Sequence, residues 1–307
     1  MLLQRTIKTS VHAIGIGVHS GSNVAMTLRP AAANTGIVFV RMDLPGHPAV
    51  RAQANQVSDT CLSTSIAEGR AEVATVEHLM SALWGLGIDN LIIELTSREV
   101  PIMDGSAQPY VKLIESVGLK SLDAPKMFMR ITRPVQVRQG DAMVALTPYN
   151  GFRASYTFVA DHPVYNRYPK RLDMVFNSDS YVKDVCGARS FGLISELEQA
   201  QQIDRCLGSN LDNAVGIDDC DIMNKDGLRY EDEFVKHKVL DAIGDLYLLG
   251  HQIIGAFEGY KSGHAINNAL AKALLENGDA WEMVTGPTSP ADGAQIAQPM
   301  ELRNTAS

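Results

Sequence analysis

The sequence lacks long apolar runs and a recognisable export signal. No stretch of its 307 residues reaches the ~18 uninterrupted apolar residues of a membrane-spanning helix. The N-terminus also lacks the apolar core, about seven residues or more, of a secretory signal. The sequence therefore predicts a cytoplasmic protein without an integral membrane segment.

Blocks of like charge are missing as well. The formal net charge is −8, and no run of five like charges occurs. An acidic surface on which both signs are mixed argues against nucleic acid as the main partner. The absence of a Lys/Arg cluster likewise argues against electrostatic attachment to a membrane.

Cysteine is scarce and scattered. The four cysteines form no C-x-x-C pair, which fits reduced thiols in a cytosolic protein. If the protein binds zinc, histidines and carboxylates must therefore supply the ligands.

What is present is enough apolar sequence for a substantial core. With 307 residues, of which 45% are hydrophobic, the chain suits two domains of about 100–150 residues each. Periodicity and turn residues predict elements in both halves. The expected strands cover residues 22–29, 36–41, 90–95, 128–137, 143–147, 154–159 and 253–257. The expected helices cover residues 76–86, 110–117, 178–202 with a break near 187–192, 231–249 and 265–275.

Runs of strands followed by pairs of helices indicate an α+β fold. Residues 120–125 show no clear periodicity and are interpreted as a linker, and residues 286–307 as a flexible tail. In each half, a helix with a histidine ends at glycine and leads into an apolar strand, which weakly indicates two related domains.

The strongest chemical pattern lies in the helix expected over residues 231–249. Glu233, His237, Asp241 and Asp245 follow one another at intervals of four and so share one helix face. The other faces are mostly apolar, which is typical of a buried helix, and buried carboxylates need a partner or a metal. A His-x-x-x-Asp pair suits metal ligation. A helix-surface ion pair explains the same spacing equally simply.

Two further segments carry histidines. Glu77 and His78 lie at the start of a helix, where a carboxylate can act as a base beside a metal ligand and where Thr75 is the expected N-cap. A solvated carboxylate in the first helical turn is the plainer interpretation of Glu77. His264 lies in a loop between a strand and a helix, where functional residues concentrate, although a loop histidine without a role is equally ordinary.

Taken together, these residues match the inventory of a hydrolytic zinc site. Two histidines and one aspartate leave a fourth position for water, as a catalytic site requires. Glu77 can take a proton from that water, and His264 can stabilise an oxyanion or protonate a leaving amine. Asp245 lies one turn beyond Asp241 and could orient His264.

At this point a family resemblance becomes clear. The chain closely resembles the UDP-3-O-acyl-N-acetylglucosamine deacetylases of lipid A biosynthesis in Gram-negative bacteria. The segments that carry the resemblance run in family order: QRT at 4–6, GIGVHSG at 15–21, TVEHL at 75–79, GLGIDN at 85–90, IMDGSA at 102–107, ARSFG at 188–192, DEFVKHK at 232–238, LDAIGDL at 240–246 and KSGH at 261–264.

The resemblance implies a role for each candidate residue. Zinc ligands are expected at His78, His237 and Asp241, with one Zn²⁺ per chain and Fe²⁺ as an alternative in the cell. The general base is expected at Glu77. His264 is expected to be the charged histidine that stabilises the oxyanion and protonates the amine.

Further roles follow from the same resemblance. Asp245 is expected to support the charged histidine. Ser190 occupies the position of a hydroxyl that binds the oxyanion and is usually threonine in the family. The expected substrate-binding residues are Leu62, Ser63, Phe191, Lys238 and Lys261.

The resemblance also implies an architecture and a substrate. Two similar domains are expected, each a small sheet with two helices, with the helical layers face to face between the sheets and one insert per domain. Residues 1–124 form the first domain and residues 125–285 the second. The second insert, near residues 195–215, is expected to form an apolar passage for an acyl chain lined by Ile203, Leu207, Leu211, Ala214 and Val215. The substrate is a UDP-linked acylated amino sugar, hydrolysed by a monomer.

Three departures from the family concern the nucleotide end of the substrate. Ala160 and Leu193 stand where aromatic residues are common, and Ala142 stands where some members have lysine.

Two alternative functions stay open. One is a zinc amidase or deacetylase with a different substrate. The other is a protein whose zinc only ties two domains together, which would require four protein ligands.

Overall fold

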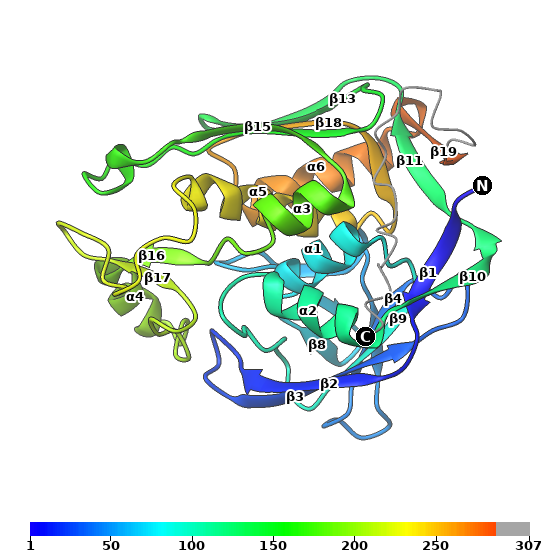
Figure 1. The fold of residues 1–307 in the computed structure, drawn as a ribbon, viewed down its shortest axis with the longest axis horizontal. Helices are drawn as coiled ribbons and strands as arrows, with labels where there is room; N and C mark the ends of the chain where they lie inside the picture. Colours follow the sequence, from blue (N-terminus) through cyan, green and yellow to red (C-terminus); the bar gives the residue numbers. More distant parts are fainter. Residues whose placement is uncertain (287–307) are drawn as a thin grey trace, which may run out of the picture.

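The computed structural model describes residues 1–286, so the tail predicted over residues 286–307 lies, apart from Gly286, outside the described residues. Within residues 1–286 the chain forms six helices (Figure 1). They are α1 Glu77–Leu86, α2 Gln108–Val117, α3 Ser178–Asp184, α4 Ile194–Gln201, α5 Glu233–Tyr247 and α6 His264–Glu276.

The first half of the chain forms a five-stranded sheet in the order β2-β3-β9-β4-β5. Its strands are β2 Val11–Ile16, β3 Asn23–Pro30, β9 Leu91–Leu95, β4 Ile37–Arg41 and β5 Ala49–Arg51. Burial alternates along β3, β4 and β9, so one face of the sheet packs on the core and the other faces outward. The strands predicted over residues 22–29, 36–41 and 90–95 are confirmed.

The second half forms a seven-stranded sheet around β18 Gln252–Tyr260, which pairs with β11, β13 and β14. The other strands are β11 Met127–Ile131, β12 Val135–Gln139, β13 Ala142–Thr147, β14 Phe152–Thr157, β15 Arg171–Phe176 and β19 Trp281–Thr285. The single strand expected over residues 128–137 is therefore wrong, because the chain breaks pairing around Pro134 and returns as a separate strand.

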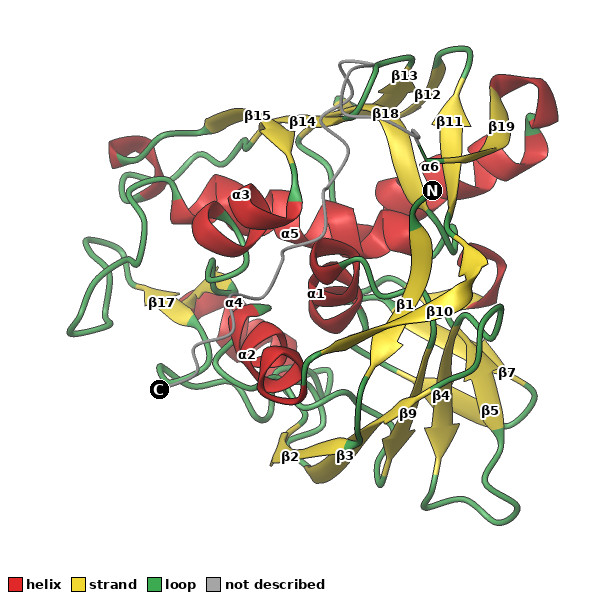
Figure 2. Ribbon diagram, turned by 45° about the vertical axis from the view of Figure 1, so that its right-hand side comes forward, coloured by secondary structure: helices red, strands yellow, loops and turns green. Residues whose placement is uncertain are grey.

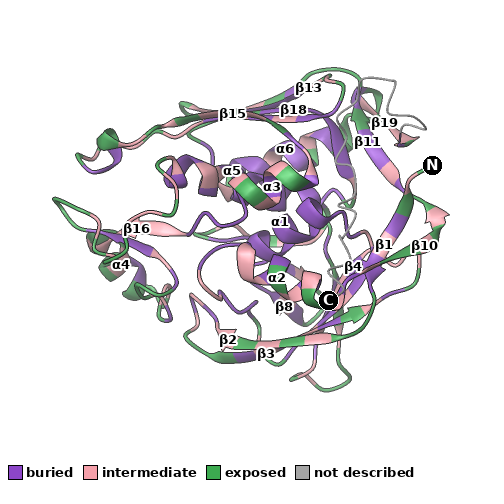
Figure 3. Cartoon of the chain, viewed as in Figure 1, coloured by how far each residue is buried: buried purple, intermediate pink, exposed green. Residues whose placement is uncertain are grey.

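Except for α4, which lies to one side, the helices lie between these two sheets, as Figures 1 and 2 show from two directions. All ten residues of α1 are buried, and α5 is buried along nearly its whole length (Figure 3). Gly87 ends α1 with a φ of 65°, a left-handed conformation that glycine adopts without steric cost. The buried residues of these helices include the polar side chains Glu77 and His78 in the first turn of α1, and His237 and Asp241 within α5.

Three small sheets complete the described structure. They consist of β1 Leu3–Ile7 with β10 Leu119–Pro125, of β6 Val57–Asp59, β7 Ser65–Glu68 and β8 Ala71–Val73, and of β16 Phe191–Leu193 with β17 Val215–Ile217. The prediction of a linker at residues 120–125 is wrong, since this segment is β10 and pairs antiparallel with β1. Its partner lies more than a hundred residues away, which local periodicity cannot reveal.

The α+β class is thus confirmed. The five-stranded sheet is built from the first half of the chain and the seven-stranded sheet from the second. Within residues 1–286, no helix combines the length and the apolar character that crossing a bilayer requires.

Candidate metal centre and active-site cavity

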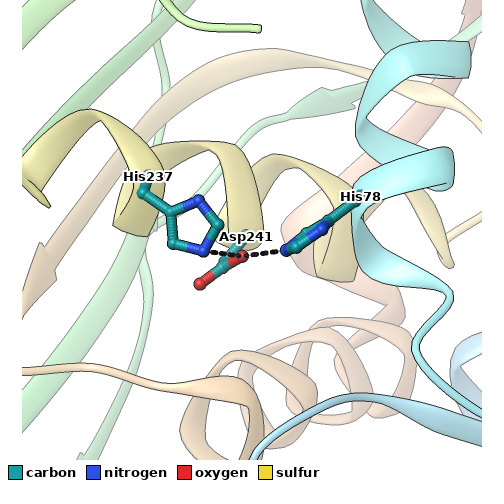
Figure 4. Close-up of side chains that lie close together, drawn as sticks. All are labelled: His78, His237 and Asp241. Carbon is teal, nitrogen blue, oxygen red and sulfur yellow. Dashed lines mark ion pairs between the residues drawn. The ribbon is translucent and has the colours of Figure 1, made fainter. Parts of the chain in front are cut away.

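Three buried side chains converge between α1 and α5. His78 comes from α1, whereas His237 and Asp241 lie one turn apart on α5 (Figure 4). Nε2 of His78 lies 3.3 Å from Oδ1 of Asp241, and Nε2 of His237 lies 3.4 Å from the same oxygen. The candidate ligand atoms all lie within 4.8 Å of one another. In the part of the chain that the structure describes, no other cluster of this kind occurs.

Several features of this cluster fit a metal ion. His237 Nδ1 lies 3.1 Å from the Ala188 carbonyl, which can only accept, so Nδ1 carries the proton and Nε2 keeps its lone pair. Oδ1 of Asp241 is buried without a hydrogen-bond donor. A lone pair on a buried, unpartnered oxygen is costly unless a cation or a proton satisfies it. Two imidazole nitrogens and one carboxylate oxygen are a donor set that suits Zn²⁺.

The charges of the cluster also suit metal binding. Burial lowers the pKa of His237 to about 3, so this ring is neutral and free to coordinate. Burial alone would raise the pKa of Asp241, but its neighbours, among them the charged Lys238, outweigh it and hold that pKa well below its ordinary value. Lys238 Nζ donates to Oδ2 of Asp241 at 2.9 Å, which leaves Oδ1 directed at the histidines.

Glu77 precedes His78 and is 2% exposed. Its Oε2 accepts a hydrogen bond from the backbone N–H of Thr64 at 3.0 Å, while Oε1 lies 4.0 Å from Nε2 of His264. Burial raises the pKa of Glu77, although the nearby histidines oppose this shift. A buried carboxylate of raised pKa is a stronger base than one in water.

His264 is the first residue of α6, and its ring lies near the carboxylate of Glu77. Its Nδ1 is 3.0 Å from Oδ2 of Asp245. Burial alone would lower the pKa of His264, but Asp245 and Glu77 outweigh it and raise that pKa to about 10. The ring is therefore charged near neutral pH, and Nε2–H remains available to a reacting group.

Ser190 lies in the segment that leads into β16. Its Oγ is 3.4 Å from Nε2 of His237. The backbone of Ser190 is held on both sides, since its N–H donates to Gly105 O at 2.8 Å and its carbonyl accepts from Val215 N at 2.7 Å. The hydroxyl is thus placed at the rim of the metal cluster.

These groups share one cavity of about 690 Å³. Its polar part includes Glu77, His78, Ser190, His237, Lys238, Asp241, Lys261 and His264. The apolar part includes Ile194, Leu197, Ala200, Leu211, Ala214, Val215 and Met223. A cavity that joins a polar cluster to an apolar wall can hold a molecule with one polar and one apolar end.

The predicted substrate-binding residues are mostly at this cavity. Leu62, Phe191, Lys238 and Lys261 line it, whereas Ser63 is buried beside Leu62 and does not. Lys261 Nζ is paired with the Asp141 carboxylate at 2.6 Å, a partner that the sequence did not suggest.

The predicted apolar lining is correct only in part. Leu211, Ala214 and Val215 line the cavity, but the prediction for Ile203 and Leu207 is wrong. These two residues are 62% and 50% exposed and do not line the cavity. Hydrophobic character alone could not show which residues of the insert face inward.

Two of the positions that depart from the family also lie at the cavity. Ala142 and Leu193 are lining residues. Ala160 instead packs, together with Leu193, against a small aromatic cluster that includes Tyr165 and Phe234.

The predicted N-cap of α1 is wrong. Val76 is the N-cap residue, and no side chain caps the helix. Thr75 has a φ of 58°, and its hydroxyl donates to the buried carboxylate of Glu99 at 3.0 Å. Glu99 also accepts from the backbone N–H groups of His19 and Ser20. A distant carboxylate thus takes the hydroxyl that a local cap would use.

Sequence reasoning also missed residues that support the charged groups. Oδ1 of Asp245 accepts from the Thr64 hydroxyl at 2.6 Å, and Oδ2 accepts from Asn267 Nδ2 at 2.9 Å. Thr64 is distant in sequence and carries no motif, so only the folded structure brings it to this carboxylate. Asn267 lies three residues after His264 on α6, a spacing that could have suggested a shared helix face.

Comparison with known proteins finds sequences that are similar over nearly the whole chain. A sequence model of the family described as UDP-3-O-acyl N-acetylglycosamine deacetylase matches residues 4–276. Curated proteins named UDP-3-O-acyl-N-acetylglucosamine deacetylase are also similar. Those of Coxiella burnetii and Chromohalobacter salexigens are 52% identical over 285 residues, and that of Thioalkalivibrio sulfidiphilus is 50% identical over 285 residues. Each alignment covers 93% of this chain and 94% of the relative.

Proposed function

The chain belongs to the UDP-3-O-acyl-N-acetylglucosamine deacetylase family, and from that premise we propose that it hydrolyses the N-acetyl group of UDP-3-O-(3-hydroxyacyl)-N-acetylglucosamine. The reaction cleaves a linear amide and releases acetate, and we assign it to the committed step of lipid A biosynthesis in a Gram-negative cell. The observation that carries the proposal is one cavity in which a buried His-His-Asp cluster, a base and a charged histidine adjoin an apolar wall.

We propose that His78, His237 and Asp241 hold one Zn²⁺ per chain, with Fe²⁺ as an alternative in the cell. Bound zinc would lower the pKa of a water molecule and polarise the amide carbonyl. Three protein ligands rather than four support a catalytic centre over a metal that only ties parts of the chain together.

Glu77 is the proposed general base. Its Oε2 is fixed by the Thr64 N–H, and Oε1 is left to accept a proton from the water that attacks the acetamide carbon. Burial raises the pKa of Glu77, which supports this role because a more basic carboxylate takes the proton more readily. The C–O bond forms as Glu77 receives that proton.

His264 is the proposed acid, with Asp245 as the carboxylate that supports it. The protonated ring can stabilise the tetrahedral oxyanion and then give its Nε2 proton to the departing amine as the C–N bond breaks. A pKa raised to about 10 supports the charged state before reaction. The Ser190 hydroxyl, 3.4 Å from His237, is proposed to donate to the same oxyanion.

The substrate contacts are also proposals. Leu62 and Ser63 are assigned to the sugar, with Phe191 beside them in the cavity. Lys238 and Lys261 are assigned to sugar and phosphate groups. Of these two lysines, Lys238 is paired with Asp241, whereas Lys261 has an exposed partner at Asp141 that a diphosphate could displace. The apolar wall, which includes Leu211 and Val215, is assigned to the 3-O-acyl chain.

We propose that residues 1–124 and 125–285 form two domains that share the site. The first supplies Glu77 and His78, and the second supplies His237, Asp241 and His264. Acting as a monomer in the cytoplasm, the protein would need only its UDP-linked acylated amino sugar as partner.

The proposal is tested by comparing acetate release from UDP-3-O-(3-hydroxyacyl)-N-acetylglucosamine and from UDP-N-acetylglucosamine. Because the apolar wall can bind only the acylated compound, we expect that compound to be strongly preferred. Equal rates for both would point to a zinc amidase with a different natural substrate. Acyl chains of graded length then identify the length that the cavity accepts.

A further inference from the structure

We propose that Thr64 is a positioning residue that holds the carboxylates of Glu77 and Asp245 in fixed relation to each other. The inference rests on the function proposed above, in which Glu77 is the base and Asp245 supports the acid. Thr64 lies just before β7, in the segment that follows the cavity-lining Leu62, and is 1% exposed.

The backbone of Thr64 is bound to the start of α1. Its carbonyl oxygen accepts from the N–H of Val76 at 3.2 Å, and its own N–H donates to Oε2 of Glu77 at 3.0 Å. Val76 is the N-cap residue of α1, so both bonds act at the point where the helix begins. The backbone of Thr64 therefore fixes the carboxylate of Glu77 with one oxygen occupied and the other free.

The side chain of Thr64 is bound to α5. Its hydroxyl donates to Oδ1 of Asp245 at 2.6 Å. The other oxygen of Asp245 accepts from His264 Nδ1 at 3.0 Å and from Asn267 Nδ2 at 2.9 Å. A carboxylate with donors on both oxygens cannot rotate freely, so the hydroxyl of Thr64 keeps Oδ2 aimed at His264.

Thr64 thus connects the two halves of the acid–base apparatus. Among residues 1–286, it is the one residue that donates a hydrogen bond both to Glu77 and to Asp245. Glu77 and His264 must face the same reacting amide, and the distance between their reactive atoms is 4.0 Å. Since errors of about 1 Å in such a pair can cost about 10²-fold in rate, one residue that fixes both members has a direct effect on turnover.

Threonine is suited to this position because its branched Cβ restricts the side chain to few rotamers. Serine keeps the hydroxyl but rotates more freely, whereas valine and alanine lack the hydroxyl. Valine preserves the shape of threonine, and alanine leaves space without placing a methyl group against the Asp245 carboxylate. These four side chains therefore separate the effect of the hydrogen bond from the effect of packing.

The experiment measures kcat and KM for acetate release from UDP-3-O-(3-hydroxyacyl)-N-acetylglucosamine by zinc-loaded wild type, Thr64→Val, Thr64→Ala and Thr64→Ser. We expect kcat to fall by about 10-fold to 100-fold in the valine and alanine variants, with KM and zinc content nearly unchanged. Thr64→Ser should recover most of the wild-type kcat. Equal losses in all three variants, or no loss in Thr64→Ala, would overturn the proposal.

Thr6→Val is the matched control. Thr6 is equally buried at 1% exposed, and its hydroxyl accepts from Ala31 N at 3.0 Å, whereas Thr6 does not line the cavity. We expect Thr6→Val to lower stability without lowering kcat. A comparable fall of kcat in this control would show that losing any buried threonine hydroxyl is sufficient, and the proposal would fail.

A second readout does not depend on turnover. In protein labelled with ¹⁵N-histidine, the Nδ1–H of His264 should give a downfield proton resonance because it is bonded to Asp245. We expect this resonance to shift or broaden in Thr64→Ala and to be retained in Thr64→Ser. An unchanged resonance in Thr64→Ala overturns the role of Thr64, whereas absence of acetate release by wild type overturns the proposed function alone.

Discussion

Gly244 of α5 lies directly against the carbonyl oxygen of Glu77 in α1. A Cβ atom at position 244 would overlap this oxygen and the carbonyl carbon of Glu77, far inside contact distance. The close approach of the two helices at this point brings His78 of α1 to Asp241 of α5. The absence of a side chain at Gly244 is therefore a condition for assembling the His-His-Asp cluster.

The first prediction follows from this contact. Replacing Gly244 with alanine should force α1 and α5 apart, destabilise the protein by about 1–3 kcal/mol and weaken zinc binding. Thermal unfolding and competition with a chelator measure the two effects. Gly278→Ala is the control, because a Cβ there meets nothing within 4 Å and the residue is far in sequence from Gly244. A Gly244→Ala protein with wild-type stability and zinc affinity would contradict the packing argument.

The second prediction concerns removal of the metal. The cluster offers three ligands, and the helices that carry them are packed into a continuous apolar core. Chelation should therefore abolish acetate release while leaving the circular dichroism spectrum intact, and zinc should raise the unfolding temperature when it is restored. If the apoprotein were unfolded, the metal would be structural and the catalytic assignment would be in doubt.

The third prediction concerns Glu77. Glu77→Gln keeps the size of the side chain and an oxygen that can accept from Thr64 N, but it removes the proposed base. We expect kcat to fall by about 10²–10⁴-fold while zinc is retained. Steady-state kinetics together with metal analysis check this. Glu94→Gln, at an outward-facing ion pair with Arg29 on the five-stranded sheet, should leave kcat unchanged. Near-normal turnover of zinc-loaded Glu77→Gln would exclude Glu77 as the base.

The fourth prediction concerns pH. In the proposed mechanism His264 acts in its protonated form, so kcat should decline as pH rises through the pKa of this residue. Burial lowers that pKa, and Asp245 more than compensates for the burial. Asp245→Asn should therefore move the alkaline limb of the kcat profile to lower pH. When both proteins are measured with the same metal loaded, the comparison isolates the effect of the carboxylate.

A control variant completes the pH experiment. Asp173 pairs with Arg153 on the exposed surface of the second sheet, so Asp173→Asn should leave the alkaline limb where it is in wild type. If Asp245→Asn also left the limb unmoved, His264 would not be the group that titrates there.

Local patterns predicted much of the fold. Strands β3, β4 and β9 alternate in burial and were expected within one or two residues of their bounds, as were α1 and α5. The strand β10, over residues 119–125, could not be predicted from its own residues. It depends on pairing with β1, and the spacing of apolar residues in either segment does not reveal that pairing. Pro134 was the available signal that the strand expected over residues 128–137 would break.

Only part of the site could be predicted from the spacing of residues in the sequence. The intervals of four between Glu233, His237, Asp241 and Asp245 reveal one helix face without any structure. No spacing rule connects that face to His78, which α1 brings in from the other half of the chain, and only the family resemblance made the connection. Thr64 carried no signal at all, because its role depends on touching two residues that are distant from each other in sequence.

The most direct test of the account is a titration of metal-free protein with zinc while acetate release from UDP-3-O-(3-hydroxyacyl)-N-acetylglucosamine is measured. The account predicts that activity rises with added zinc and levels off near one equivalent per chain. It also predicts that replacing His78, His237 or Asp241 with alanine abolishes the rise at that equivalence. A folded protein that binds one equivalent of zinc at these residues and releases no acetate would contradict the account.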